Sequence, residues 1–231
     1  MWADILSYFE EIPMDIQLIF RTWVNALTQP GEEFFAAQRE NASATLSTAL
    51  TWIIAASIIA ALLGALRSTI FSAPMGGFDQ LVDLLPPDVQ DEFGTAVETG
   101  PTAGTAFSFA TIIIGPISFL IGVGIYHLIA RLLGGIGQYG RYTYLYATFA
   151  APLMIVTSVL GFIPVLGGCI SAILAIYQLV LAYYATKVEY NLTQGRAIIV
   201  VVAPLLVGVI LAACLAVVAL GAVLSILRNF T

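Results

Sequence analysis

The feature that most constrains this chain is a series of five stretches, each of roughly 18 or more residues, without Asp, Glu, Lys or Arg. A helix of that length crosses the roughly 30 Å hydrocarbon core of a bilayer, where every backbone polar group needs an internal partner. Only 10% of the 231 residues are charged, whereas a soluble domain has about 25%. The sequence therefore predicts an all-α, polytopic integral membrane helical bundle with five transmembrane helices.

The predicted domain organisation follows these stretches. Residues 1–41 form an amphipathic cytoplasmic leader, and residues 42–231 form a five-span membrane domain with an acidic external loop at 67–106. Because the connection at residues 163–168 is short and apolar, the third and fourth spans should form a tight hairpin. The spans are expected at about 44–66, 107–130, 142–162, 168–186 and 197–227.

The leader contains an apolar stripe with helical spacing of three and four residues, formed by Ile16, Ile19, Phe20, Trp23 and Leu27. Pro30-Gly31 should end this helix, and Glu32 begins another. The stripe fits a helix in the membrane interface, with Trp23 as the interfacial anchor. It fits equally well a helix packed against the bundle, and both interpretations stay open.

The cations predict an N-in, C-out orientation, because cytoplasmic segments are enriched in Lys and Arg. Only Arg67 and Arg228 would then lie outside, together with the acidic loop, which includes a predicted short amphipathic helix around residues 78–85. The six cations on the inner side would be Arg21, Arg39, Arg131, Arg141, Lys187 and Arg196.

Composition and motifs give no sign of an enzyme, a cofactor or a metal. The net charge is −6 and there is no basic run, so nucleic acid is not an expected partner. Cys169 and Cys214 lie in apolar stretches without metal-ligand spacing, and are expected to pack as small hydrophobic residues. No hydrolytic motif is present, so we expect no catalytic, cofactor-binding or metal-binding residues.

Residues 135–140 match the pattern GxGxxG, but an apolar span precedes them and no acid follows at the distance a dinucleotide site needs. They are better explained as a close-approach turn between two helices. Its backbone donors, together with Arg131 and Arg141, could also meet lipid phosphates of the inner leaflet.

The polar residues near the inner ends of the spans are the candidate site. His127 is expected to bond to a neighbouring helix, with a proton-coupled role as the alternative. Glu189 is expected to pair with Arg131, Arg141 or Arg196. The predicted contacts to lipid headgroups or a partner at this rim are His127, Arg131, Arg141, Lys187, Glu189 and Arg196.

The order and spacing of several segments resemble the Yip family of Ypt/Rab-interacting membrane proteins, in its prokaryotic branch. The segments run from about Trp23 to Leu220. They are Trp23 through Pro30 to Phe34-Phe35, the run from His127 to Gly135, Tyr144 to Phe149 with Pro152, and Leu192 to Ala197 with Pro204. The resemblance implies five spans and a cytosolic N-terminus. The DLYGP signature of eukaryotic members is absent, with only Gly115-Pro116 at the position of its end, which argues against binding of small GTPases.

The leading hypothesis is a non-enzymatic membrane-organising or protein-interaction module, in which the leader and the tight hairpin insert into the inner leaflet. The expected partners are the lipid bilayer and other membrane proteins or further copies of the chain. One alternative is an accessory subunit of a larger membrane complex. Another is a small transporter, scramblase or channel with a polar path along His127, Arg131 and Glu189. The predicted location is a prokaryotic cell membrane.

Overall fold

The computed structural model describes residues 16–70, 100–163 and 165–229, and these residues form seven α-helices and no strand. The predicted helix at 78–85 and the residues before Ile16 lie outside the described ranges. Two short helices come first, α2 (Ile16–Thr28) and α3 (Glu32–Arg39). The long helices are α4 (Leu46–Ile70), α7 (Gly100–Leu132), α8 (Tyr139–Leu160), α9 (Leu166–Tyr190) and α10 (Gln194–Asn229).

The protein is an all-helical membrane bundle. Four of the described helices are long and apolar enough to cross a membrane, namely α4, α7 from Ser108 onward, α8 and α9, and a shorter apolar stretch covers Gln194–Ile210 of α10. All five predicted spans coincide with helices. The ends differ by a few residues: α9 continues through polar residues to Tyr190, beyond the predicted end at 186, whereas α8 ends at Leu160, before the predicted end at 162. The N-in, C-out orientation stays a prediction.

Helix α8 forms the centre of the bundle. It contacts α2, α3, α4, α7 and α9, and all its side chains from Tyr142 to Leu153 are buried. Small residues in this stretch, such as Ala147 and Ala151, let neighbouring helices approach closely. By contrast, α4, α7, α9 and α10 expose many large apolar side chains, which suits contact with lipid.

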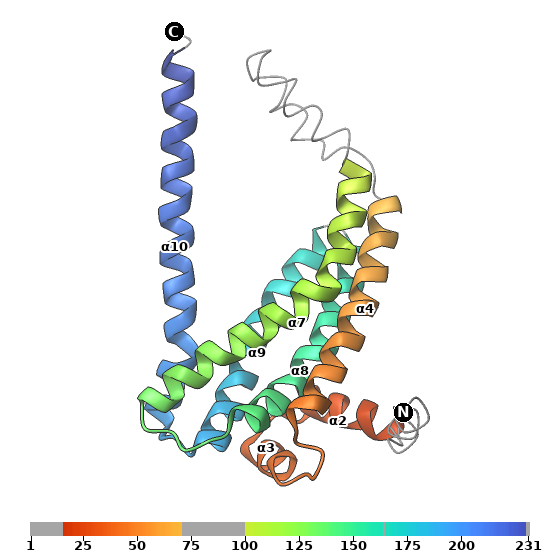
Figure 1. Ribbon diagram of the computed structural model, residues 1–231, viewed down its shortest axis with the longest axis vertical. Coiled ribbons are helices and arrows are strands. Elements are labelled where there is room, and N and C mark those ends of the chain that lie inside the picture. The colour runs from red at the N-terminus through yellow and green to blue at the C-terminus, as the bar shows by residue number, and fades with distance from the viewer. Residues whose placement is uncertain (1–15, 71–99, 164, 230–231) are drawn as a thin grey trace, which may run out of the picture.

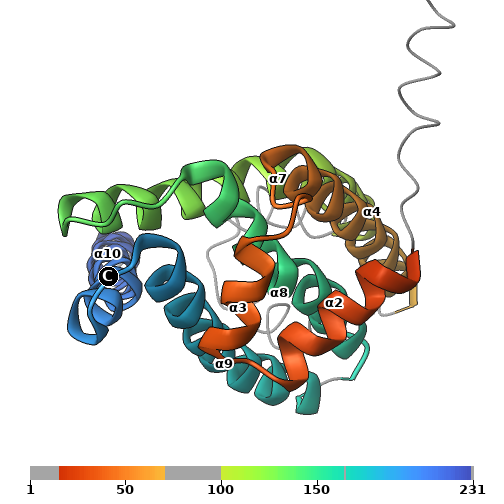
Figure 2. The ribbon, with the colours of Figure 1, turned by 90° about the horizontal axis from the view of Figure 1, so that it is seen from below.

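The two ends of the bundle differ. Helices α2 and α3 lie across one end (Figures 1 and 2), together with the α7–α8 and α9–α10 connections. We call this the capped end. The α8–α9 hairpin lies at the opposite end, which we call the hairpin end (Figure 1). Most of α10 stands apart from the other helices, with its contacts to α7 and α9 near its beginning (Figure 1).

The leader is docked on the bundle. Phe35 of α3 is fully buried and meets the ring of Phe149 in α8, with ring centroids 6.1 Å apart. Tyr177 of α9 donates a hydrogen bond of 2.8 Å to the carbonyl of Leu27, where α2 ends. Of the two interpretations of the leader, packing against the bundle therefore describes one face of α2, and Leu18, Phe20 and Val24 on its other faces remain exposed.

Candidate functional site

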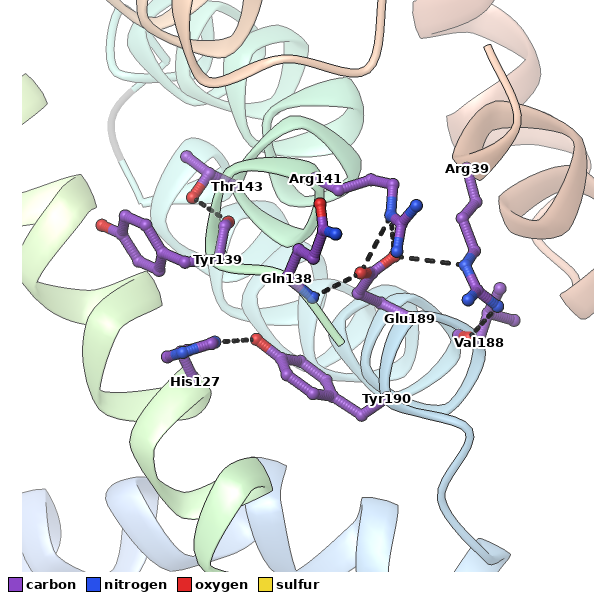
Figure 3. Close-up of polar contacts among 9 residues, drawn as sticks. All are labelled: Arg39, His127, Gln138, Tyr139, Arg141, Thr143, Val188, Glu189 and Tyr190. Carbon is purple, nitrogen blue, oxygen red and sulfur yellow. Dashed lines mark hydrogen bonds and ion pairs between the residues drawn. The ribbon is translucent and has the colours of Figure 1, made fainter. Parts of the chain in front are cut away.

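The capped end contains a buried carboxylate, that of Glu189 near the end of α9, which has no solvent exposure. A buried charge is stable only when it is paired and hydrogen-bonded. Arg141 Nε lies 3.0 Å from each carboxylate oxygen, and the backbone N–H of Gln138 donates to Oε1 at 2.8 Å (Figure 3). Because Gln138 directly precedes α8, the negative charge lies at a helix N-terminus, where free N–H groups favour it.

Arg39 brings the leader into the same site. Its Nε lies 3.5 Å from Glu189 Oε2, and its Nη1 donates to the carbonyl of Val188 at 3.2 Å (Figure 3). A cation near the C-terminus of α9 also complements the helix dipole. We call Arg39, Gln138, Arg141 and Glu189 the Glu189 cluster. It joins α3, α8 and α9 at one point.

The glycine-rich turn at residues 134–137 lets the backbone pass close to Glu189. Gly134 has φ of +88°, and the N–H groups of Gly134 and Gly135 bond to the carbonyls of Arg131 and Ala130, a Schellman ending of α7. A Cβ at Gly137 would lie 2.7 Å from the carbonyl oxygen of Glu189. The GxGxxG match therefore belongs to a close-approach turn, and the element before it is the helix α7.

His127 lies beside the cluster and bonds to the neighbouring helix. Its Nδ1 is 2.5 Å from the hydroxyl of Tyr190 (Figure 3). Tyr190 is almost fully buried, and its ring packs against that of Tyr142 at 5.0 Å. The Tyr142 hydroxyl in turn bonds to Thr186 at 2.9 Å. The histidine is thus part of an aromatic hydrogen-bonded layer between α7, α8 and α9.

Two other arginines at this end, Arg131 and Arg196, bind backbone carbonyls. Arg196 Nη1 donates to Leu133 at 3.1 Å, and Arg131 Nη1 reaches the carbonyl of Gly135 at 3.5 Å. Both carbonyls belong to the turn that follows α7. Of the three arginines predicted as partners of Glu189, only Arg141 pairs with it among the residues that the structure describes.

Two further predicted residues tie the leader to the bundle. Lys187 forms an ion pair with Glu32 at the start of α3. Trp23 packs edge-on against Trp52 of α4, with ring centroids 6.0 Å apart. Its Nε1 is buried and has no hydrogen-bond acceptor among the described residues, and its role as interfacial anchor stays a prediction.

An open depression of about 570 Å³ lies beside the cluster. Two arginines and one glutamate are among its lining residues, so it suits a polar or charged group. No set of three or more His, Cys, Asp or Glu side chains in the described ranges could hold a metal ion. Its lining residues are Arg39, Glu40, Asn41, Ala44, Gln138 and Arg141.

Sequence reasoning missed Arg39, Gln138 and Tyr190 as site residues. Gln138 acts through its backbone, which no side-chain pattern reveals. A signal for Arg39 existed, because it follows the buried Phe35 by four residues and therefore shares its helix face. Tyr190 resembles any other aromatic residue near the end of a span.

Comparison with known families agrees with this architecture. The model of the Yip1 domain matches residues 24–227, most of the chain. No curated protein and no solved structure matches the sequence. The match includes all four long membrane helices and most of α10. The chain therefore belongs to the Yip1 domain family of membrane proteins.

Proposed function

We propose that this Yip-family protein is a non-enzymatic membrane-organising module, which holds an amphipathic helix, α2, at the inner surface of the membrane. The proposal rests on one observation: the apolar stripe on α2 is wider than the face that docks on the bundle. Trp23 and Ala26 dock on the bundle, while Phe20 and Val24, one turn apart, remain 65% and 38% exposed. Leu18, on the other side of the docked face, is 58% exposed.

These exposed side chains fit the membrane interface. Because α2 lies across the capped end of a bundle that crosses the membrane (Figure 2), its flanks meet the headgroup region, and the outward side carries the polar Arg21. Each large apolar side chain moved from water into the acyl boundary contributes roughly 1.5–3 kcal/mol. The inserted volume would enlarge one leaflet only, which favours curved membranes.

The α8–α9 hairpin cannot share this role. Leader and hairpin were both expected to insert into the inner leaflet, but the hairpin lies at the end of the bundle opposite to α2 and α3 (Figure 1). The proposed mechanism therefore depends on α2 alone, held in place by the Glu189 cluster and by the Lys187–Glu32 ion pair.

The test uses the full chain reconstituted into vesicles of different diameters. Replacing Leu18, Phe20 and Val24 by Ser removes the exposed apolar flanks and leaves the docked face intact. Replacing Arg21 by Ser is the matched control on the polar side of the same helix. We expect the protein to be enriched in the smaller vesicles, the triple variant to lose this enrichment, and the control to keep it. Equal partitioning of all three proteins would refute the proposal.

A second candidate function, accessory subunit of a larger membrane complex, is supported by α10. Its described side chains from Leu205 to Ile210 are largely exposed, and the helix stands apart from the bundle (Figure 1). Purification from native membranes in mild detergent, followed by native mass spectrometry, separates the candidates. Recovery in a fixed ratio with other chains supports the accessory subunit, and recovery alone supports the membrane-organising module.

A proton or ion path along His127, Arg131 and Glu189 receives less support. Glu189 is held by two arginines and a backbone N–H, and Arg131 contacts a turn carbonyl. These contacts favour a structural role, because a conducting carboxylate has to exchange partners with water or an ion.

A further inference from the structure

A cavity of about 450 Å³ lies between α4, α7 and α8 toward the hairpin end, far from the Glu189 cluster. Half of its lining residues are serines and threonines, residue types that are common where membrane helices pack closely. They come from three helices: Ser57 from α4, Ser108 and Thr111 from α7, and Thr157 and Ser158 from α8.

Three of these hydroxyl groups already donate their proton within their own helix. Thr157 and Ser158 donate to backbone carbonyls of α8, and Thr111 donates to that of Ser108. Serine and threonine commonly bond in this way within membrane helices. The hydroxyl oxygens can still accept hydrogen bonds, so the cavity suits a ligand group that carries N–H or O–H donors.

Arg67 supplies a positive charge to the same cavity. Its Nη1 lies against Gly161 of α8, where a Cβ would be only 2.8 Å away, so the glycine gives the guanidinium room to lie over the end of α8. No carboxylate in the described part of the chain pairs with Arg67. An arginine at the end of a membrane helix is well placed to bind a lipid phosphate.

A second depression, of about 510 Å³ between α7, α8 and α9, continues the first and shares Gly115, Met154 and Thr157 with it. Apolar side chains such as Phe119 and Val123 line it. From Ser108 to Val123 the two spaces follow α7 for about 22 Å, at 1.5 Å per residue. About 12 Å of it, from Gly115 to Val123, lies along the second depression, which is most of the roughly 15 Å of hydrocarbon in one leaflet.

We propose that this continuous groove binds one phospholipid, with its phosphate on Arg67, its headgroup donors on the serine and threonine hydroxyls, and one acyl chain along Phe119 and Val123. A headgroup with N–H or O–H donors, such as that of phosphatidylethanolamine, satisfies the hydroxyl oxygens. Phosphatidylcholine has the same net charge but no such donor. The site is independent of α2 and of the proposed membrane-organising function.

The test is native mass spectrometry of the full-length protein, delipidated in mild detergent and titrated with phosphatidylethanolamine, phosphatidylcholine or inorganic phosphate. Arg67→Gln removes the charge, and Arg21→Gln removes one at the capped end as the control. Gly122→Leu fills the groove, because Gly122 lines it and has open space around it. Gly124→Leu is the matched control, since Gly124 also has open space but does not line the groove.

We expect one phosphatidylethanolamine to bind more tightly than phosphatidylcholine. Arg67→Gln should weaken it about tenfold, the loss of one charge-assisted hydrogen bond. Gly122→Leu should weaken it as well, and both control variants should bind like the natural chain. The proposal is overturned if Arg67→Gln binds like Arg21→Gln, or if the two glycine variants bind equally. Displacement of the lipid by millimolar inorganic phosphate would also overturn it and would indicate a site for a soluble anion.

Discussion

Arg39 in the leader and Glu189 at the end of α9 form an ion pair, with Nε and Oε2 3.5 Å apart. Arg39 also bonds to the carbonyl of Val188, from which it is separated by 149 positions in the sequence. The contact holds the leader where the start of α8 meets the end of α9, so the leader is fixed to two helices that are long and apolar enough to cross a membrane. The strength of this attachment can be measured.

Glu189→Gln should destabilise the protein more than Arg39→Gln. Removing the carboxylate leaves two arginines without their anion and should cost about 3 kcal/mol. Arg39 is about one-third exposed, and Glu189 keeps Arg141 when Arg39 is lost, so that change should cost about 1 kcal/mol or less. Thermal unfolding in detergent measures both values. Equal losses would mean that the ion pair with Arg39 accounts for the whole contribution of the carboxylate and that Arg141 adds nothing.

Gly137→Ala should destabilise the turn between α7 and α8. The new Cβ would lie 2.7 Å from the carbonyl oxygen of Glu189, which is backbone and cannot move aside. The expected cost is about 1–3 kcal/mol. Gly208→Ala in α10 is the control, because that glycine has nothing within 4 Å and alanine favours a helix by roughly 0.5–1 kcal/mol. The two variants should therefore shift the unfolding temperature in opposite directions.

Because His127 and Tyr190 are hydrogen-bonded, we expect the effects of replacing them on the free energy of unfolding to be coupled. Tyr190→Phe should cost about 1 kcal/mol, since it leaves the ring in place and removes one buried hydrogen bond. His127→Phe in the same background should then add less than it does alone. A double-mutant cycle on the free energy of unfolding measures this difference. Strict additivity would show that the 2.5 Å contact contributes nothing.

Trp23 distinguishes packing from interfacial anchoring. Its buried Nε1 has no acceptor in the described part of the chain, so Trp23→Phe should change the free energy of unfolding by no more than about 1 kcal/mol. Trp23→Ala removes the ring that packs on Trp52 and should cost about 3 kcal/mol. A large loss with phenylalanine would mean that the indole N–H binds water or a headgroup, as an interfacial anchor does.

The positions of the spans could be predicted from sequence because length and apolarity alone decide what can cross a bilayer. The identity of the central helix could not be predicted in this way. Helix α8 is the least hydropathic of the four long candidate spans, yet it is the most buried. Lipid and protein interiors are equally apolar, so hydropathy does not separate lipid-facing from protein-facing residues. The tyrosines Tyr142, Tyr144 and Tyr146 resemble an aromatic belt in sequence but are buried.

The candidate site was predicted in part for a related reason. Glu189 could be selected because a carboxylate near the end of an apolar helix needs a partner. The sequence offers three arginines as possible partners of Glu189. Which of them pairs with it depends on the path of the backbone, which the sequence does not reveal. Arg141 begins α8 beside the carboxylate, whereas Arg131 and Arg196 face the turn after α7.

The predicted orientation can be tested at the two ends of the bundle. In a background with Cys169 and Cys214 changed to Ser, a single cysteine is introduced by Val165→Cys in the hairpin or by Glu40→Cys after α3. Both positions are exposed, Val165 at 82%. If the capped end is cytoplasmic, an impermeant maleimide added to intact cells should label the variant at position 165 only, and the variant at position 40 only after permeabilisation. The reverse pattern would place the Glu189 cluster outside and would contradict the argument from the distribution of cations.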